Sequence, residues 1–346
     1  MTTAGQGSRR HIDALDGLRG LAAVYVFLYH ARVIPLFGQE MVILFFILSG
    51  FVIHYVTHAG NHRTKITTYL AHRVRRIYPL YLVALITAYV AAAIALHTMP
   101  DPRWKNFFQN VAMLQGLTGF LGDFWALPYW ENAPLWSLSF EWWFYMLFIP
   151  LSLMGLVSET RQFLLVAVLS IVAFFVHQLH PGIVTLVLNY FVIWWFGVEL
   201  SREYRATGAI TLRNQIAPVV VVGICTALWG ALALRKVLAG GTVVFGAAPI
   251  LQARQFGAAF VFILAGFTWK QFNFRYFRYI IGPFAAFAPI SYALYILHYP
   301  VLRVVRTLVP GSIPIIQALV AIAILVPLCY VLEVVGQKKL VAFLSR

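Results

Sequence analysis

Charged side chains are scarce in this sequence. They make up 11% of its 346 residues, against 61% for apolar residues, whereas a soluble domain usually carries about a quarter charged residues. So few charges cannot cover a water-facing surface, which excludes a soluble globular protein. Cysteine is nearly absent as well, because only Cys225 and Cys329 occur and both lie inside apolar runs. A disulfide framework and a cysteine-based metal site are therefore excluded.

Apolar runs recur along the whole chain between charged or Gly/Pro-rich breaks. A helix needs about 20 apolar residues to cross a hydrocarbon core of about 30 Å. The runs predict one all-α membrane domain over 1–346 with about ten spans, at 15–36, 41–58, 78–97, 135–157, 163–179, 183–200, 216–234, 256–270, 283–304 and 313–335. The first run contains polar residues and no cleavage pattern follows it, so it is not read as a signal peptide. Glycines and Pro128 break up the segment 104–128, which favours a re-entrant or interfacial loop there.

Acidic residues are few, 11 against 26 basic ones, which gives a net charge of +15. Ten spans put both termini on one side of the membrane. If that side is the cytoplasm, 18 of the 26 basic residues fall in inner loops and ends, as the preference of lysine and arginine for cytoplasmic loops requires. The sequence therefore predicts cytoplasmic termini, with anionic lipid rather than nucleic acid facing the positive charge.

Ionisable residues inside apolar runs are costly, and they usually mark function. Arg19 and His30 in the first predicted span are eleven residues apart, so a helix places them on one face with a rise of about 16 Å. Asp16 lies three residues before Arg19 and can pair with it. A histidine bonded to a helix carbonyl would be the structural explanation, but the aligned Asp–Arg pair favours a functional one.

Two further places lie in the next segments. Ser49 and Gly50 sit in the middle of the second span, where close helix packing and a substrate role for the hydroxyl are both open. The stretch 72–79 contains His72, Arg73, Arg75 and Arg76 and ends at a proline, and we predict it as an inner loop. Positive-inside anchoring explains part of this charge; a clamp for phosphates explains it equally well.

Two more places lie later in the chain. Glu141, close to Trp136 and Ser139 at the predicted outer start of the fourth span, favours a site for a hydroxyl-rich substrate, although tryptophan is also ordinary at an interface. In the ninth span, Ser291, Tyr295 and His298 have i, i+4, i+7 spacing. They would form one polar face that looks into the helix bundle.

Together these motifs resemble the acyltransferase 3 family of bacterial membrane O-acyltransferases, which act on surface carbohydrates. The resemblance lies in 15–20 with His30, 44–51, 73–79, 134–145 and 291–298, in the family's order. It implies that Arg19 and His30 are the essential pair, that Arg73 and Arg76 are the basic pair, and that Glu141 is the acidic position. Ile43 and His72 depart from the family pattern, where a polar and a basic residue are frequent.

The resemblance implies an enzyme of the bacterial inner membrane that takes acyl-coenzyme A, with acetyl expected, as its donor. Arg19, Arg73, Arg75 and Arg76 would bind the donor. Catalysis would use His30, Arg19 and Glu141, with His30 as general base or as a transient acyl carrier. Contacts to a carbohydrate acceptor would come from Trp136, Ser139, Ser49, Ser291, Tyr295 and His298.

No permanently bound cofactor, metal or extracytoplasmic hydrolase-like domain is expected, and residues 1–13 would form a short cytoplasmic segment. The alternative is a transporter or flippase for a lipid-linked sugar, which ten spans would also suit. The two halves of the chain show no sequence similarity of the kind that inverted-repeat transporters have, which favours the enzyme. A structural membrane subunit is a third possibility.

Overall fold

The computed structural model describes residues 4–58, 64–117, 125–155, 157–337 and 339, with side chains described from residue 14 onward. The helices of the first half are α1 (Ala4–His30), α2 (Gly38–Thr57), α3 (Ile66–Leu96), α4 (Trp104–Val111) and α5 (Trp136–Phe148). The next are α6 (Glu159–Leu179), α7 (Ile183–Thr207), α8 (Ile216–Leu238) and α9 (Ile250–Gln271). The chain continues with α10 (Phe277–Ile280), the 3-10 segment η4 (Gly282–Ile290), α11 (Ser291–Leu308), α12 (Pro314–Cys329) and the π-helical segment η5 (Tyr330–Gly336). Three short segments complete the set: the 3-10 turns η1 (Tyr129–Glu131) and η2 (Ala133–Leu135), and the π-helical η3 (Ile149–Leu153).

The described chain contains no strand, so the predicted all-α membrane fold is confirmed. Eight helices are long and apolar enough to cross a membrane: α2, α3, α6, α7, α8, α9, α11 with η4, and α12 with η5. The other two predicted spans correspond to α1 and α5. Ten crossings and cytoplasmic termini therefore stay predictions.

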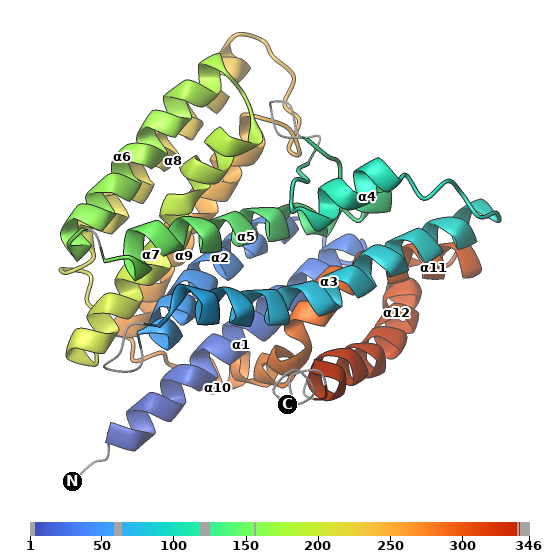
Figure 1. The fold of residues 1–346 in the computed structure, drawn as a ribbon, viewed down its shortest axis with the longest axis horizontal. Helices are drawn as coiled ribbons and strands as arrows, with labels where there is room; N and C mark the ends of the chain where they lie inside the picture. Colours follow the sequence, from blue (N-terminus) through green and yellow to red (C-terminus); the bar gives the residue numbers. More distant parts are fainter. Residues whose placement is uncertain (1–3, 59–63, 118–124, 156, 338, 340–346) are drawn as a thin grey trace.

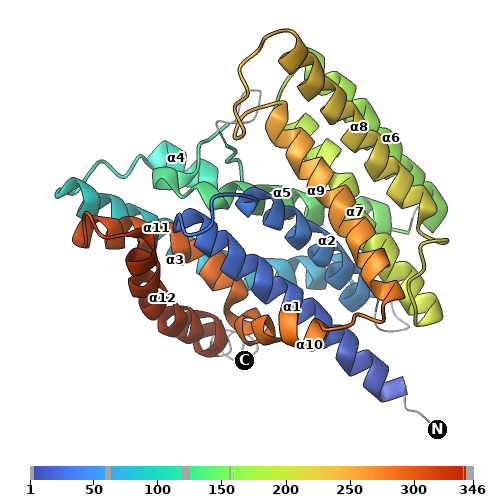
Figure 2. The ribbon, with the colours of Figure 1, turned by 180° about the vertical axis from the view of Figure 1, so that it is seen from behind.

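The helices form two groups (Figures 1 and 2). Helices α6, α7, α8 and α9 make one tilted group, and α1, α2, α3, α11 and α12 make the other, with α5 running between them. The groups are joined by the contact of α2 with α7. Gly50 permits this contact, because a Cβ atom there would lie 1.9 Å from the Trp194 carbonyl oxygen. Gly197 faces it, with a Cβ position 2.0 Å from the Ile47 carbonyl oxygen.

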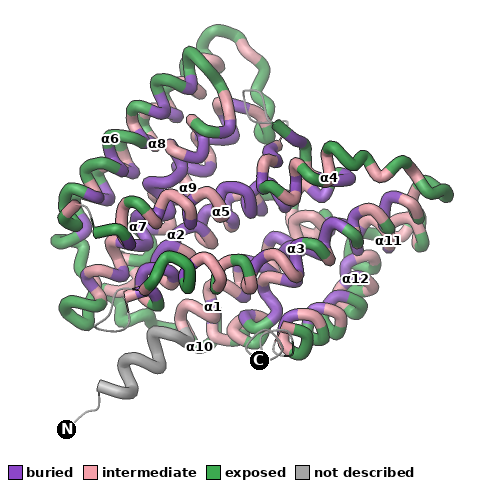
Figure 3. The backbone as a smooth tube through the Cα atoms, viewed as in Figure 1, coloured by how far each residue is buried: buried purple, intermediate pink, exposed green. Residues whose placement is uncertain are grey.

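Buried residues concentrate where the two groups meet, and exposed ones follow the outer faces of α6, α8 and α12 (Figure 3). Many of the exposed residues are large and apolar, among them Leu164, Val220 and Leu319. An apolar outer surface is what a hydrocarbon environment requires.

Several predicted boundaries are wrong. The first span ends at His30 instead of residue 36, because the chain turns at residues 31–37, where Arg32 and Phe37 have positive φ angles. The third begins at Ile66, twelve residues before the predicted start. The fourth is α-helical only to Phe148 and ends in the π-helical η3. Segment 104–128 contains the helix α4, with 118–124 outside the described residues.

Candidate active site

A pocket of about 680 Å³ lies between the helices of the second group and α5. Pockets of this size are usual for cofactors and small molecules. Its polar lining comprises Asp16 and Arg19 on α1, Ser49 on α2, His72, Arg73, Arg75 and Arg76 on α3, Ser137, Glu141 and Tyr145 on α5, Ser291, Tyr292 and Tyr295 on α11, and Gln337 directly after η5. Residues far apart in the sequence that we predicted as site residues thus share one cavity, which we call the arginine pocket.

The basic stretch is not the loop that we predicted. It lies within the first three turns of α3, and the helix continues through Pro79. The segment 66–77 contains no glycine or proline, and its three arginines are good helix formers, so the helix can extend beyond its membrane-crossing part. Because the segment is helical, His72, Arg73, Arg75 and Arg76 fall on neighbouring turns and all line the pocket.

Two of these arginines have defined partners. The guanidinium of Arg73 lies 5.6 Å from the ring centre of Tyr69 and 5.7 Å from that of Tyr145. Its Nε is buried and has no hydrogen-bond partner among the described residues. Arg76 forms an ion pair of 2.8 Å with Glu333 and donates a hydrogen bond of 3.0 Å to Gln337. Arg73 is therefore the less neutralised of the two cations.

Glu141 does not lie at the opposite end of the bundle from the basic segment, as its predicted place at an outer helix start implied. It lines the arginine pocket. Ser49 donates a hydrogen bond of 2.7 Å to its Oε1, and the Tyr145 hydroxyl donates to the same oxygen. The error arose because α5 runs between the helix groups (Figure 1) and its residue Glu141 lines the pocket.

For Gly50 and Ser49 the structure shows two different positions, and a substrate role for the Ser49 hydroxyl stays a prediction. Gly50 serves the contact between α2 and α7. Ser49 lines the pocket, where its hydroxyl contacts Glu141 and lies 3.2 Å from the Tyr145 hydroxyl. It also accepts a hydrogen bond of 3.2 Å from the indole N–H of Trp194.

The polar face predicted in the ninth span looks into the bundle. Ser291, Tyr295 and His298 are all buried, at 1%, 8% and 0% exposure. Ser291 and Tyr295 line the arginine pocket, and His298 lies one turn further along α11. The Tyr295 ring is 6.1 Å from the His298 ring, so this face leads from the pocket toward a histidine pair.

His298 contacts His30, the last residue of α1. Their closest ring nitrogens, Nδ1 of His30 and Nε2 of His298, are 3.1 Å apart. The rings of Tyr29 and Tyr299 pack edge-on against His30, and Arg306 donates a hydrogen bond to its carbonyl oxygen. His30 is thus held in one orientation at the end of its helix.

The neighbouring carbonyls assign the protons of this pair. Nδ1 of His298 lies 3.1 Å from the Leu294 carbonyl oxygen, which can only accept, so this nitrogen carries the proton. In the neutral ring Nε2 is then an acceptor. Nδ1 of His30 has two acceptors next to it: the Val26 carbonyl oxygen at 3.0 Å and Nε2 of His298 at 3.1 Å. It is therefore protonated as well. The unprotonated nitrogen of His30 is consequently Nε2, which can act as a base.

Two predicted substrate contacts belong to the core instead. Trp136 is 3% exposed, and the rings of Phe46 and Phe140 cover it at 6.2 and 5.3 Å. Ser139 is fully buried and donates to the carbonyl oxygens of Gln115 and Trp136. Neither residue lines the pocket, because α5 turns this face toward the α4 region and the core.

Sequence reasoning missed three residues of the pocket region. Tyr145 and Tyr292 carry no special signal, since tyrosine is common in membrane helices. Glu333 does carry one, because it is a carboxylate inside the last apolar run, which is the criterion that selected Arg19 and His30. It lies on η5, and π-helical turns occur frequently at functional sites.

The fold and the pocket define a polytopic helical membrane protein with an arginine-lined pocket. A family model described as an acyltransferase domain matches residues 12–334. The chain therefore belongs to the acyltransferase 3 family, as the sequence motifs predicted.

Individual relatives match shorter regions. The acyltransferase MdmB of Streptomyces mycarofaciens is 29% identical over 161 residues, which cover 40% of this chain and 38% of that protein. The protein called "Protein 2 in picA locus" of Rhizobium radiobacter is 39% identical over 79 residues, 20% of this chain and 40% of that protein. The chain thus spans about two fifths of the length of the curated relatives it matches. No solved structure matches it significantly.

Proposed function

We propose that the protein is a membrane O-acyltransferase of the bacterial inner membrane. It would move an acyl group, with acetyl expected, from acyl-coenzyme A to a carbohydrate hydroxyl. The observation that supports the proposal is that Tyr295, which lines the arginine pocket, lies 6.1 Å from the ring of His298, which in turn contacts His30. Family membership and the name of the relative MdmB support acyl transfer; the carbohydrate acceptor follows from the motif resemblance.

The arginine pocket suits the donor. Coenzyme A carries a pyrophosphate and a 3′-phosphate, and arginine binds phosphate oxygens through charge-assisted hydrogen bonds. Arg19, Arg73, Arg75 and Arg76 line one cavity. Arg19 and His30 are separated by a rise of about 16 Å along α1, so the long, thin pantetheine arm would cross this distance. The phosphates would then stay among the arginines while the thioester lies near the histidine pair.

The reaction transfers the acyl group from the thioester sulfur of acyl-coenzyme A to the acceptor hydroxyl oxygen. Nε2 of His30 takes the proton of the acceptor hydroxyl as its oxygen attacks the thioester carbonyl carbon. The new C–O bond forms, the C–S bond breaks, and the departing thiolate takes the proton from His30. His298 would keep the proton of His30 on Nδ1 throughout. Attack by Nε2 itself, with a transient acyl-histidine, uses the same geometry and stays open.

The test measures label transfer from acetyl-coenzyme A. Membranes that contain the protein are incubated with acetyl-coenzyme A labelled in the acetyl group, and free thiol and labelled glycan are quantified. His30→Ala should lower transfer at least a hundredfold, since a positioned base contributes about 10²–10⁴. The matched control is His180→Ala, an exposed histidine at the end of α6. A wild-type membrane that releases no thiol, as expected of a transporter or flippase, would overturn the proposal.

A further inference from the structure

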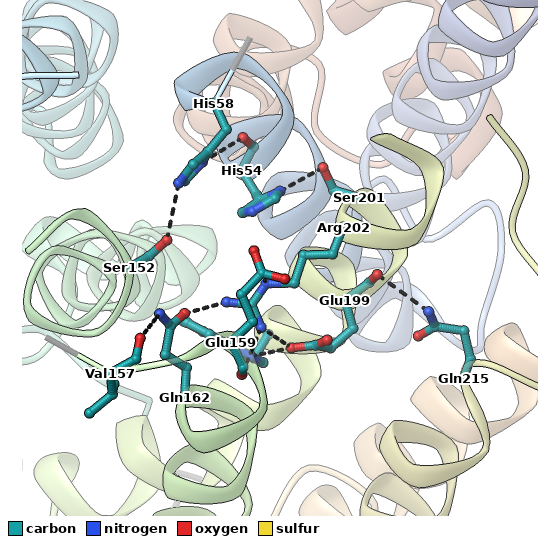
Figure 4. Close-up of polar contacts among 11 residues, drawn as sticks. His54, His58, Ser152, Val157, Glu159, Gln162, Glu199, Ser201, Arg202 and Gln215 are labelled. Atoms are coloured by element: carbon teal, nitrogen blue, oxygen red, sulfur yellow. Dashed lines mark hydrogen bonds and ion pairs between the residues drawn. The ribbon is translucent and has the colours of Figure 1, made fainter. Parts of the chain in front are cut away.

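A second cavity of about 570 Å³ lies where α2 and α7 end and α6 begins. It shares no lining residue with the arginine pocket. Its polar lining includes His58 from the end of α2, Glu159 and Gln162 from α6, and Arg202 and Arg205 from α7. Figure 4 shows these elements converging on Arg202. The ring centre of Phe148 lies 6.2 Å from that of His58, which lines this cavity, and 5.9 Å from that of Tyr69, over which Arg73 of the arginine pocket lies.

The N-terminus of α6 forms one wall of this cavity. The helix has 21 residues and begins at Glu159, after the N-cap residue Ser158, and both residues line the cavity. Within the described chain, the Ser158 side chain makes no capping hydrogen bond. The first N–H groups of a helix lack intrahelical partners and carry the positive end of its dipole. Such a terminus favours an anion, and phosphate in particular.

Arg202 adds a buried cation to this wall. Its side chain is only 8% exposed, and it pairs with Glu199 at 2.6 Å. It also donates to the Glu159 carbonyl oxygen at 3.3 Å and to the Gln162 side chain, which fixes it against the first turn of α6 (Figure 4). Its Nε is buried without a hydrogen-bond partner among the described residues, and Oε1 of Glu159 lies 3.9 Å from it.

The rim of the cavity carries the remaining charges. Arg205 is exposed and is held by the Tyr55 carbonyl oxygen at 3.2 Å. The Glu159 side chain is 71% exposed, so it can turn away from a bound anion. His58 lies 3.5 Å from the Ser152 hydroxyl, and burial lowers the pKa of His58 below its ordinary value. It therefore offers a neutral hydrogen-bonding group at neutral pH.

The surroundings of the cavity indicate whether its phosphate belongs to a lipid or to a soluble molecule. The outer face of α6 becomes apolar directly after its first turns, with Leu164, Leu165 and Val168 exposed at 54%, 43% and 57%. This face lies at the edge of the molecule (Figures 1 and 3). We propose that the cavity binds the phosphate of an anionic phospholipid headgroup, whose acyl chains lie along the apolar face of α6. In the predicted topology this lipid belongs to the cytoplasmic leaflet.

The experiment measures lipid binding to the purified full chain in detergent. Phosphatidylglycerol and phosphatidylcholine with the same acyl chains are titrated, and bound lipid is counted by native mass spectrometry. Arg205→Gln should weaken phosphatidylglycerol binding about tenfold, since one charge-assisted contact is lost. Glu159→Gln should strengthen it, because a repelling carboxylate is removed. Arg213→Gln, an exposed arginine that does not line the cavity, is the matched control and should change nothing.

The contrary results are equally clear. Equal binding of both lipids, or equal phosphatidylglycerol binding by wild type and Arg205→Gln, would overturn the proposal. Inorganic phosphate and coenzyme A are titrated as soluble probes. If either binds with the Arg205 dependence while phosphatidylglycerol does not, the cavity takes a soluble phosphate and the lipid assignment is wrong. The melting temperature of each variant shows that it is folded, and Arg205 is suitable because it is exposed.

Discussion

At the scale of single residues, the two histidines have different roles: His30 is the proposed base, and His298 positions it. His298 accepts a hydrogen bond from Nδ1 of His30 and so keeps Nε2 of His30 free as the base. We expect His298→Ala to lower kcat at least tenfold and to leave KM for acyl-coenzyme A unchanged. His298→Gln should recover part of the rate, because its amide oxygen can accept the same bond. In the His30→Ala background, His298→Ala should add no loss, since the residues act as a unit. A tenfold rise in KM for acyl-coenzyme A with unchanged kcat would assign His298 to donor binding instead.

A substitution of Glu141 tests whether the phosphates of coenzyme A bind in the arginine pocket. A unit charge at an effective dielectric constant of about 20 contributes about 1–2 kcal/mol at roughly 8–16 Å. Glu141→Gln removes a negative charge beside the arginines and keeps an oxygen for Ser49. Acyl-coenzyme A, a polyanion, should therefore bind about tenfold more tightly. Equilibrium binding of coenzyme A measures this, with Glu131→Gln as a control for an exposed carboxylate outside the pocket. Unchanged binding would mean that the phosphates lie elsewhere.

The sequence predicted which residues belong to the site better than it predicted how those residues are arranged. Arg19, Ser49, Glu141 and His298 could be identified because each is a polar residue inside an apolar run. Burying such a residue is costly, so its position in the sequence is informative. The contact of His30 with His298 was not predictable, since spacing along one helix says nothing about which helix faces it. Glu333 was missed although it meets the same criterion, and without it the ion pair of Arg76 could not be anticipated.

At the scale of helices, glycines set how closely the two groups approach. We expect Gly50→Ala to destabilise the protein, because the added Cβ would lie 1.9 Å from a backbone carbonyl oxygen that cannot move alone. Overpacking of this kind costs about 1–3 kcal/mol or more, and thermal unfolding in detergent measures it. The control is Gly230→Ala in α8, where a Cβ atom meets nothing within 4 Å. That variant should be neutral or slightly stabilised. Equal melting temperatures for both variants would show that α2 and α7 separate at no cost.

Helix boundaries show the limit of hydropathy. The apolar centres of the predicted spans are helical, but hydropathy alone places the start of α3 at residue 78. Half of the twelve residues before it are polar or charged, and the segment is still helical, because helix formation depends on backbone hydrogen bonds and propensity rather than on apolarity alone. For α5 the error has the opposite sign. Its 13 α-helical residues are about 20 Å long, shorter than the hydrocarbon core of about 30 Å, although the apolar run extends further.

At the scale of the whole molecule, the proposed reaction requires the arginine pocket to open toward the cytoplasm, where acyl-coenzyme A is made. The side of each loop depends on which helices cross. Lys65 precedes α3, Lys105 follows it, and Arg213 follows α7. The helices α5, α6 and α7 lie between the last two positions. If all three cross, Lys105 and Arg213 lie on opposite sides of the membrane; if the short α5 does not cross, they lie on the same side.

Labelling of single introduced cysteines decides this, since Cys225 and Cys329 are buried and should react little. These positions replace residue 62, which lies outside the described part of the chain. In intact cells an impermeant maleimide should label Lys105→Cys, and it should label Lys65→Cys and Arg213→Cys only after permeabilisation. All three side chains are exposed, so lack of labelling reflects the side of the membrane rather than burial. Labelling of both Lys105→Cys and Arg213→Cys in intact cells would show that α5 does not cross. Labelling of Lys65→Cys alone would invert the whole topology and turn the arginine pocket away from its donor.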